Sequence, residues 1–193
     1  WDNFNSNTGV SVSSSAPLTN MMVYTLPTLV DGLSVSTSYR PQVEDVAETE
    51  LGYSATYTGV DGLSVSYGSA DLDRAGTATD GDQTVWKASY AYGPVTVAAS
   101  NSDYDITGTA SDQETSSMKV SYTVTDDFSI SYGTEEIKTP GAAATAEYTG
   151  YGASYTTGGM TISANMQDGK DVDQTTGTDN QIDYWNVGLS FAF

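Results

Sequence analysis

The last residues of the chain, Trp185-Asn186-Val187-Gly188-Leu189-Ser190-Phe191-Ala192-Phe193, carry a large apolar side chain at every second position. The positions between them hold small or polar residues. Successive side chains of a β-strand point to opposite faces of the sheet, so this segment is predicted to be a strand with one apolar and one polar face. Such a strand needs an apolar environment on one side only.

The same alternation recurs along the chain, and no segment shows the 3.6-residue period of an amphipathic helix. It is present in residues 33–40, 51–58, 63–68, 86–92, 95–99, 118–124, 128–132, 151–155 and 160–166. Residues that favour tight turns separate pairs of these segments at Val30–Gly32, Val60–Gly62, Gly93–Pro94, Asp126–Asp127 and Gly158–Gly159. Because Gly, Pro and Asp suit such turns, we predict a series of hairpins that repeats about every 32 residues.

Longer polar stretches alternate with the short turns. They are predicted to be loops at Pro41–Glu50, Ser69–Asp82, Asn101–Ser116, Gly133–Glu147 and Asp168–Asp183. A soluble β-sandwich would show the same alternation within its strands. Short turns at one end and long loops at the other are typical of bacterial outer-membrane barrels, whose strands need about 9–11 residues. The expected fold class is therefore all-β, an antiparallel transmembrane β-barrel.

The chain is strongly acidic, with 25 Asp and Glu residues against 6 Lys and Arg and a formal net charge of -19. On the loop boundaries above, 20 of the 25 acids fall in the long loops, and the middle of each predicted apolar face carries no charge. A field of this sign repels nucleic acid and attracts cations. We therefore expect no nucleic-acid partner and an external mouth that prefers cations.

The chain contains no Cys and no His. It therefore cannot form disulfides or the His-dependent triads and general bases of many hydrolases. The Ser-His pair of barrel phospholipases is excluded for the same reason. We therefore expect no catalysis of these kinds.

The closing strand looks like the C-terminal strand of outer-membrane proteins, which the barrel-assembly machinery reads as a signal. The residues that match this signal are Trp185, Val187, Leu189, Phe191 and Phe193. The resemblance implies a location in the bacterial outer membrane and the assembly machinery as a partner. An ordinary last strand is the alternative interpretation.

A second resemblance is to the trimeric general porins of proteobacteria, in a Gly-, Ser- and Asp-rich style similar to that of alphaproteobacterial porins. It is carried by Asn20–Pro27, by Gly32–Tyr39 and by the turn Tyr92–Val97, and it covers residues 18–193. Met21 and Leu26 depart from the family pattern. The resemblance implies a homotrimeric porin, surrounded by outer-membrane lipid and lipopolysaccharide, that lets ions and small hydrophilic solutes diffuse through a water-filled channel. It also implies that the protein is not an enzyme, and we expect no cofactor.

In that family the Asn-to-Pro segment is the sixth strand. The count then gives eleven strands here, the last eleven of a sixteen-stranded porin, with residues 1–17 as the tail of the loop inserted into the pore and the first strands lacking. The alternative is a complete twelve-stranded barrel, in which residues 4–15 form one weak strand. A structural or adhesive barrel with a plugged lumen is the alternative function, although the small side chains of the polar face argue against a plug.

Three basic residues fall on the polar face of the predicted strands: Arg40, Lys87 and Lys119. In the resembled family, basic wall residues face acids of the inserted loop across the pore constriction. The resemblance makes these three residues candidate pore-lining residues. Each could equally be a basic residue near a strand end that pairs with a loop acid.

Two acidic stretches could bind Ca²⁺ through clustered carboxylates. The candidate ligands are Asp71, Asp73, Asp80 and Asp82 in one stretch, and Asp168, Asp171 and Asp173 in the other. Neither stretch fits an EF-hand. Solvated acidic loops that bind no ion are the simpler interpretation. An intermediate interpretation is that divalent ions bridge the loops to lipopolysaccharide phosphates.

Tyrosines near the predicted strand ends fit the aromatic girdles of membrane barrels. They include Tyr24, Tyr39, Tyr57, Tyr92 and Tyr155.

Overall fold

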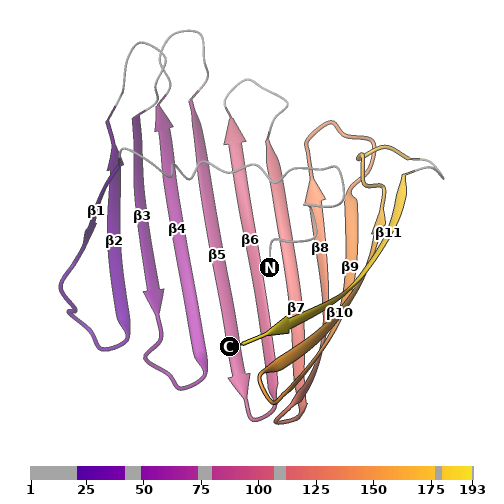
Figure 1. Ribbon diagram of the computed structural model, residues 1–193. Helices are drawn as coiled ribbons and strands as arrows, with labels where there is room; N and C mark the ends of the chain where they lie inside the picture. The colour runs from indigo at the N-terminus through magenta and orange to yellow at the C-terminus, as the bar shows by residue number, and fades with distance from the viewer. Residues whose placement is uncertain (1–20, 42–48, 74–79, 107–111, 177–179, 193) are drawn as a thin grey trace.

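The computed structural model describes residues 21–41, 49–73, 80–106, 112–176 and 180–192. These residues form one antiparallel sheet of eleven strands, in which each strand pairs with the next along the chain (Figure 1). The strands are β1 (Met22–Thr25), β2 (Leu33–Arg40), β3 (Thr49–Tyr57), β4 (Leu63–Asp73), β5 (Gly81–Tyr92), β6 (Val95–Ile106), β7 (Gln113–Thr125), β8 (Phe128–Lys138), β9 (Ala146–Thr157), β10 (Met160–Lys170) and β11 (Gln181–Phe191). The expected all-β, antiparallel architecture with eleven strands is confirmed.

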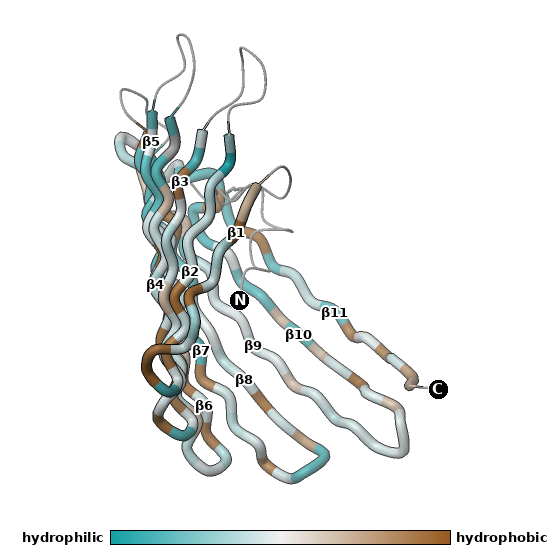
Figure 2. Tube along the Cα trace, turned by 90° about the vertical axis from the view of Figure 1, so that its left-hand side faces the viewer, coloured by the Kyte–Doolittle hydropathy of each residue, from teal (hydrophilic) through white to brown (hydrophobic). Residues whose placement is uncertain are grey.

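The sheet curves like part of a barrel wall and has two open edges (Figures 1 and 2). Within the described residues, β1 pairs only with β2 and β11 pairs only with β10. Lipid cannot satisfy the free backbone groups of an open edge. In a membrane, the backbone groups of both edges therefore need hydrogen-bonding partners. The segment 1–17, for which a loop tail or a weak strand was predicted, lies outside the described residues.

The tight turns lie where the sequence placed them. Gly32 and Gly62 have φ values of 76° and 74°, a left-handed conformation that favours glycine. The turns close through hydrogen bonds of 3.0 Å from the amide of Leu33 to the carbonyl of Val30 and from that of Leu63 to that of Val60. The Asp-Gly pairs of these turns therefore provide both the polar residue and the backbone freedom that a tight turn requires.

The long connections are shorter than the sequence predicts, because the strands continue into the predicted loops. For example, β6 runs to Ile106 and β7 begins at Gln113, well inside the predicted loop 101–116. The apolar alternation ends near residue 99, but the backbone ladder does not depend on apolar side chains and continues. The strands therefore project beyond the apolar band at the end of the sheet that carries the long connections.

No helix among the described residues is long and apolar enough to be a candidate membrane span.

Candidate pore wall and external mouth

Cross-strand pairing divides the side chains of the sheet between two faces. The apolar face carries the large apolar residues of each strand; Tyr67 pairs with Trp86, and Met166 pairs with Trp185. The polar face carries Ser, Thr, Gly and Asn at the alternate positions. In a membrane barrel the apolar face contacts lipid and the opposite face lines the lumen. The predicted alternation thus gives a continuous lipid-facing surface across all eleven strands.

The apolar face is exposed in this structure, as a lipid-facing surface must be. Trp185, Val187, Leu189 and Phe191 have exposed fractions of 75%, 64%, 57% and 54%. These four candidate residues of the assembly signal lie together on the apolar face of β11, at the open edge of the sheet. Phe193, the fifth, lies outside the described residues.

The two faces exchange character at the external end, the end with the long connections. Here the apolar face becomes acidic, while the polar face carries apolar residues. Ten strand acids lie on the apolar face beyond the apolar band: Asp71, Asp73, Asp82, Asp103, Asp105, Glu114, Glu136, Glu147, Asp168 and Asp183. We call this set the outer acidic belt. A solvated outer surface of this kind marks the part of the wall that projects above the lipid.

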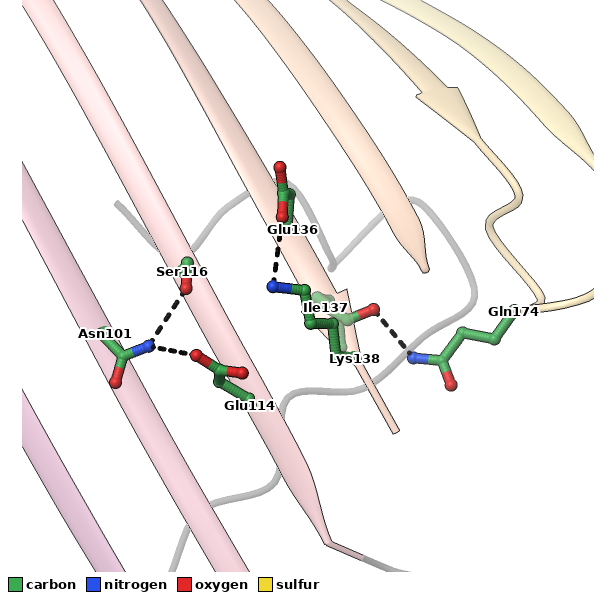
Figure 3. A network of polar contacts seen from close by, with 7 residues as sticks. All are labelled: Asn101, Glu114, Ser116, Glu136, Ile137, Lys138 and Gln174. Carbon is green, nitrogen blue, oxygen red and sulfur yellow. Dashed lines mark hydrogen bonds and ion pairs between the residues drawn. The ribbon is translucent and has the colours of Figure 1, made fainter. Parts of the chain in front are cut away.

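Polar contacts within the outer acidic belt are shown in Figure 3. The Asn101 amide donates hydrogen bonds of 3.0 Å to a carboxylate oxygen of Glu114 and to the hydroxyl of Ser116. Nearby, the Lys138 ammonium lies 3.5 Å from a carboxylate oxygen of Glu136. Both side chains of that ion pair are about half exposed, so the pair contributes little to stability.

The opposite face at the same level contains small apolar clusters. Ile137, Ala146 and Tyr148 are buried together with Val172, and Ile182 packs against them. Tyr104 and Ile106 form a second cluster. Ile137, Tyr148 and Ile182 share the face of the small polar residues, since the register pairs Ile137 with Ala146 and Ile182 with Gly169. The inner side of the external mouth is therefore packed rather than open along this part of the wall.

The three candidate pore-lining residues lie on the polar face, but the structure does not bring them into one group. Lys87 pairs with Ser100, and Lys119 with Ala98, so the two exposed lysines flank β6. Two strand spacings and an offset of two residues along β6 separate their Cα atoms by about 12 Å. Arg40 lies apart from them, at the external end of β2.

The polar face also carries two acids that the sequence analysis assigned to loops, Glu50 and Glu135. Glu50 is 5% exposed and is the register partner of Arg40. Glu135 is 3% exposed and accepts a hydrogen bond of 2.9 Å from the hydroxyl of Ser117. The continued two-residue period, in which Glu135 follows Ser131 and Gly133, could have identified it. The strand residues of the polar face thus carry three basic and two acidic side chains.

A hollow of about 310 Å³ lies on the polar face between β1 and β5. Its lining includes the polar residues Glu50, Gln83 and Ser38 and the glycines Gly52 and Gly68. The small residues of neighbouring strands leave this space open. The hollow shows that the polar face is not filled by its own side chains here.

The candidate calcium ligands are distributed between strands and connections. Asp71 and Asp82 are register partners, while Asp168 pairs with Asp183. Asp171 instead lies 3.7 Å from the Lys170 ammonium. Within the ranges that the structure describes, no three acidic side chains lie close enough together to hold a metal ion. Calcium binding therefore stays a prediction, and the arrangement of these carboxylates gives it no further support.

The sequence profile of a family described as Gram-negative porin matches residues 1–193. No curated protein sequence matches the chain.

Several solved porin structures share the fold. An anion-selective porin from Comamonas acidovorans has a TM-score of 0.65 and 16% identity, over 78% of this chain and 48% of that one. OmpT of Vibrio cholerae has a TM-score of 0.63 and 14% identity, over 89% and 63%. OmpF of Salmonella typhi, in complex with daunomycin, has a TM-score of 0.67 and 18% identity, over 89% and 62%. The chain thus spans between about half and just under two thirds of the length of these proteins, and the low identities show a likeness of fold alone.

Proposed function

Since the chain belongs to the Gram-negative porin family, which is located in the outer membrane and is not enzymatic, we propose that its strands form part of the wall of a water-filled channel. Ions and small hydrophilic solutes would diffuse passively through it. The observation that carries the proposal is the division of the sheet into an exposed apolar face and a face of small polar residues with exposed lysines. The remaining wall would come from strands that pair with β1 and β11.

Conductance in a planar lipid bilayer tests this proposal. The native protein should produce discrete single-channel steps, since solute flow through a fixed water-filled lumen is all-or-none for each inserted channel. A protein that inserts into the bilayer without conducting would contradict the proposal. That result would favour the alternative, a structural or adhesive barrel with a plugged lumen.

We further propose that the channel prefers cations. Support comes from the outer acidic belt, whose charge surrounds the external mouth. The acids of this belt lie on the outside of the wall, and the polar face has a slight excess of basic strand residues. The preference should therefore depend on the long-range field, which reaches about 10 Å at 0.1 M salt but only about 3 Å at 1 M. Reversal potentials measured in salt gradients should show a cation preference that weakens as the salt concentration rises. An anion preference at low salt would overturn the proposed cation preference.

We also propose three kinds of partner. Two further copies would complete a homotrimer, the barrel-assembly machinery would recognise β11, and lipopolysaccharide would surround the external end. We also propose that the protein is a porin of the alphaproteobacterial style and that its strands are the last eleven of a sixteen-stranded barrel, with a twelve-stranded barrel as the alternative. The intact mass of the native polypeptide tests the strand number. A mass near the 20.3 kDa of this chain would favour a twelve-stranded barrel. A mass near 30 kDa would favour a sixteen-stranded porin, because about five more strands would add roughly 10 kDa.

A further inference from the structure

The connection between β10 and β11 folds against the lumen side of the wall instead of standing away from it. We call its residues Asp171–Thr176 the strap. Val172 of the strap is only 8% exposed and packs in the cluster of Ile137, Ala146 and Tyr148. Because those residues belong to the polar face, which lines the lumen, the strap lies inside the external mouth.

Hydrogen bonds fix the strap to β8 and to the connection that follows it. The side-chain amide of Gln174 donates to the carbonyl of Ile137 at 3.2 Å, as Figure 3 shows. The carbonyl of Gln174 accepts from the amide of Ala144 at 3.1 Å. Asp171 and Gln174 have φ values of 51° and 55°, a conformation that is uncommon for residues other than glycine. The surrounding contacts therefore hold the strap in one bent conformation.

A glycine makes room for the strap. A Cβ atom added at Gly169 would lie 2.7 Å from Cγ1 of Val172 and 2.8 Å from Cγ2 of Ile182. It would also lie 3.1 Å from Cδ1 of Tyr148. Gly169 thus forms the floor of the socket that receives Val172. A side chain at this position would compete directly with Val172 for the space.

Asp173 lies between two buried strap residues, Val172 and Gln174, but is itself exposed. Because the residues on both sides of it pack against the lumen side of the wall, Asp173 also lies on that side, at the mouth. The outer acidic belt lies on the other side of that wall. We propose that the strap is a fixed constriction of the external mouth and that Asp173 is a residue that determines its preference for cations; this inference rests on the proposed channel function.

The charge is tested by comparing Asp173→Asn with Asp183→Asn in the native protein. Each variant removes one exposed carboxylate at the external end, but Asp183 belongs to the outer acidic belt. In 0.1 M salt, Asp173→Asn should lower the cation-to-anion permeability ratio by about twofold, because screening over about 10 Å weakens the field of a unit charge about 8 Å from the permeating ion. Asp183→Asn should change the ratio much less. An equal effect of the two variants would overturn the role of Asp173.

The constriction is tested by Gly169→Ala, which should displace Val172 and raise the single-channel conductance. Gly68→Ala is the matched control, since its added Cβ would lie at an ordinary 3.7 Å from the nearest atom, the carbonyl oxygen of Tyr53. Unchanged conductance in Gly169→Ala channels would overturn the constriction. A wild-type protein that does not conduct would instead overturn the proposed channel function, so the two failures are distinguishable.

Discussion

A charge placed in the middle of β10 should distinguish the two faces of the wall. Ala164 lies on the apolar face between Ile162 and Met166, and its register partners are Ala153 and Val187. An arginine on a lipid-facing strand near the bilayer centre costs about 2–4 kcal/mol. Ala164→Arg should therefore lower the folding equilibrium constant by about 30-fold to about 700-fold, at about 1.4 kcal/mol for each factor of ten.

The neighbouring Ser163 provides the control for this experiment. It lies at the same depth but on the polar face, where its register partners Ser154 and Gly188 leave room for a long side chain. Ser163→Arg should cost much less, because a water-filled lumen solvates the guanidinium group. The free energy of unfolding would be measured by denaturant titration of the native protein in lipid vesicles. Equal losses for the two variants would refute the assignment of the faces, and a larger loss for Ser163→Arg would reverse it.

Two other predictions follow from the turns and from the lysines. Gly62→Ala should destabilise the protein by more than Gly93→Ala in the same denaturant assay. Both glycines have a positive φ, which costs about 1–2 kcal/mol for alanine. Only at Gly62 would the added Cβ also collide with a backbone carbonyl, that of Ala91. If the two substitutions cost the same, the close approach at Gly62 is not rigid. Lys87→Gln should increase the cation preference in reversal-potential measurements, because it removes a positive charge from the lumen, whereas Lys138→Gln, on the outside of the wall, should change it little. A larger effect of Lys138→Gln would contradict the placement of both lysines.

The sequence determined the strands within the membrane, the identity of their two faces and the tight turns. The reason is that each of these depends on local chemistry. A two-residue hydropathy period gives both the strand and its lipid-facing side, as in β11 from Trp185 to Phe191. The Asp31-Gly32 pair likewise predicts a tight turn, and such a turn needs a residue with positive φ, which Gly32 provides.

Only the tertiary structure decided where the strands end and where the charges point. In β8 the hydropathy period ends near Tyr132, so the sequence predicts a loop at Glu135, although this residue lies in the strand and is buried beside Ser117. From the acids of the long loops, the sequence predicts an external mouth that prefers cations, but it does not distinguish the two sides of the wall. The register instead places ten strand acids on the outer side of the wall, whereas the strap that carries Asp173 packs against the inner side. The socket of Val172 combines residues that are distant in the sequence, such as Ile137 and Ile182, and such a contact is set by the packing of neighbouring strands rather than by any local pattern.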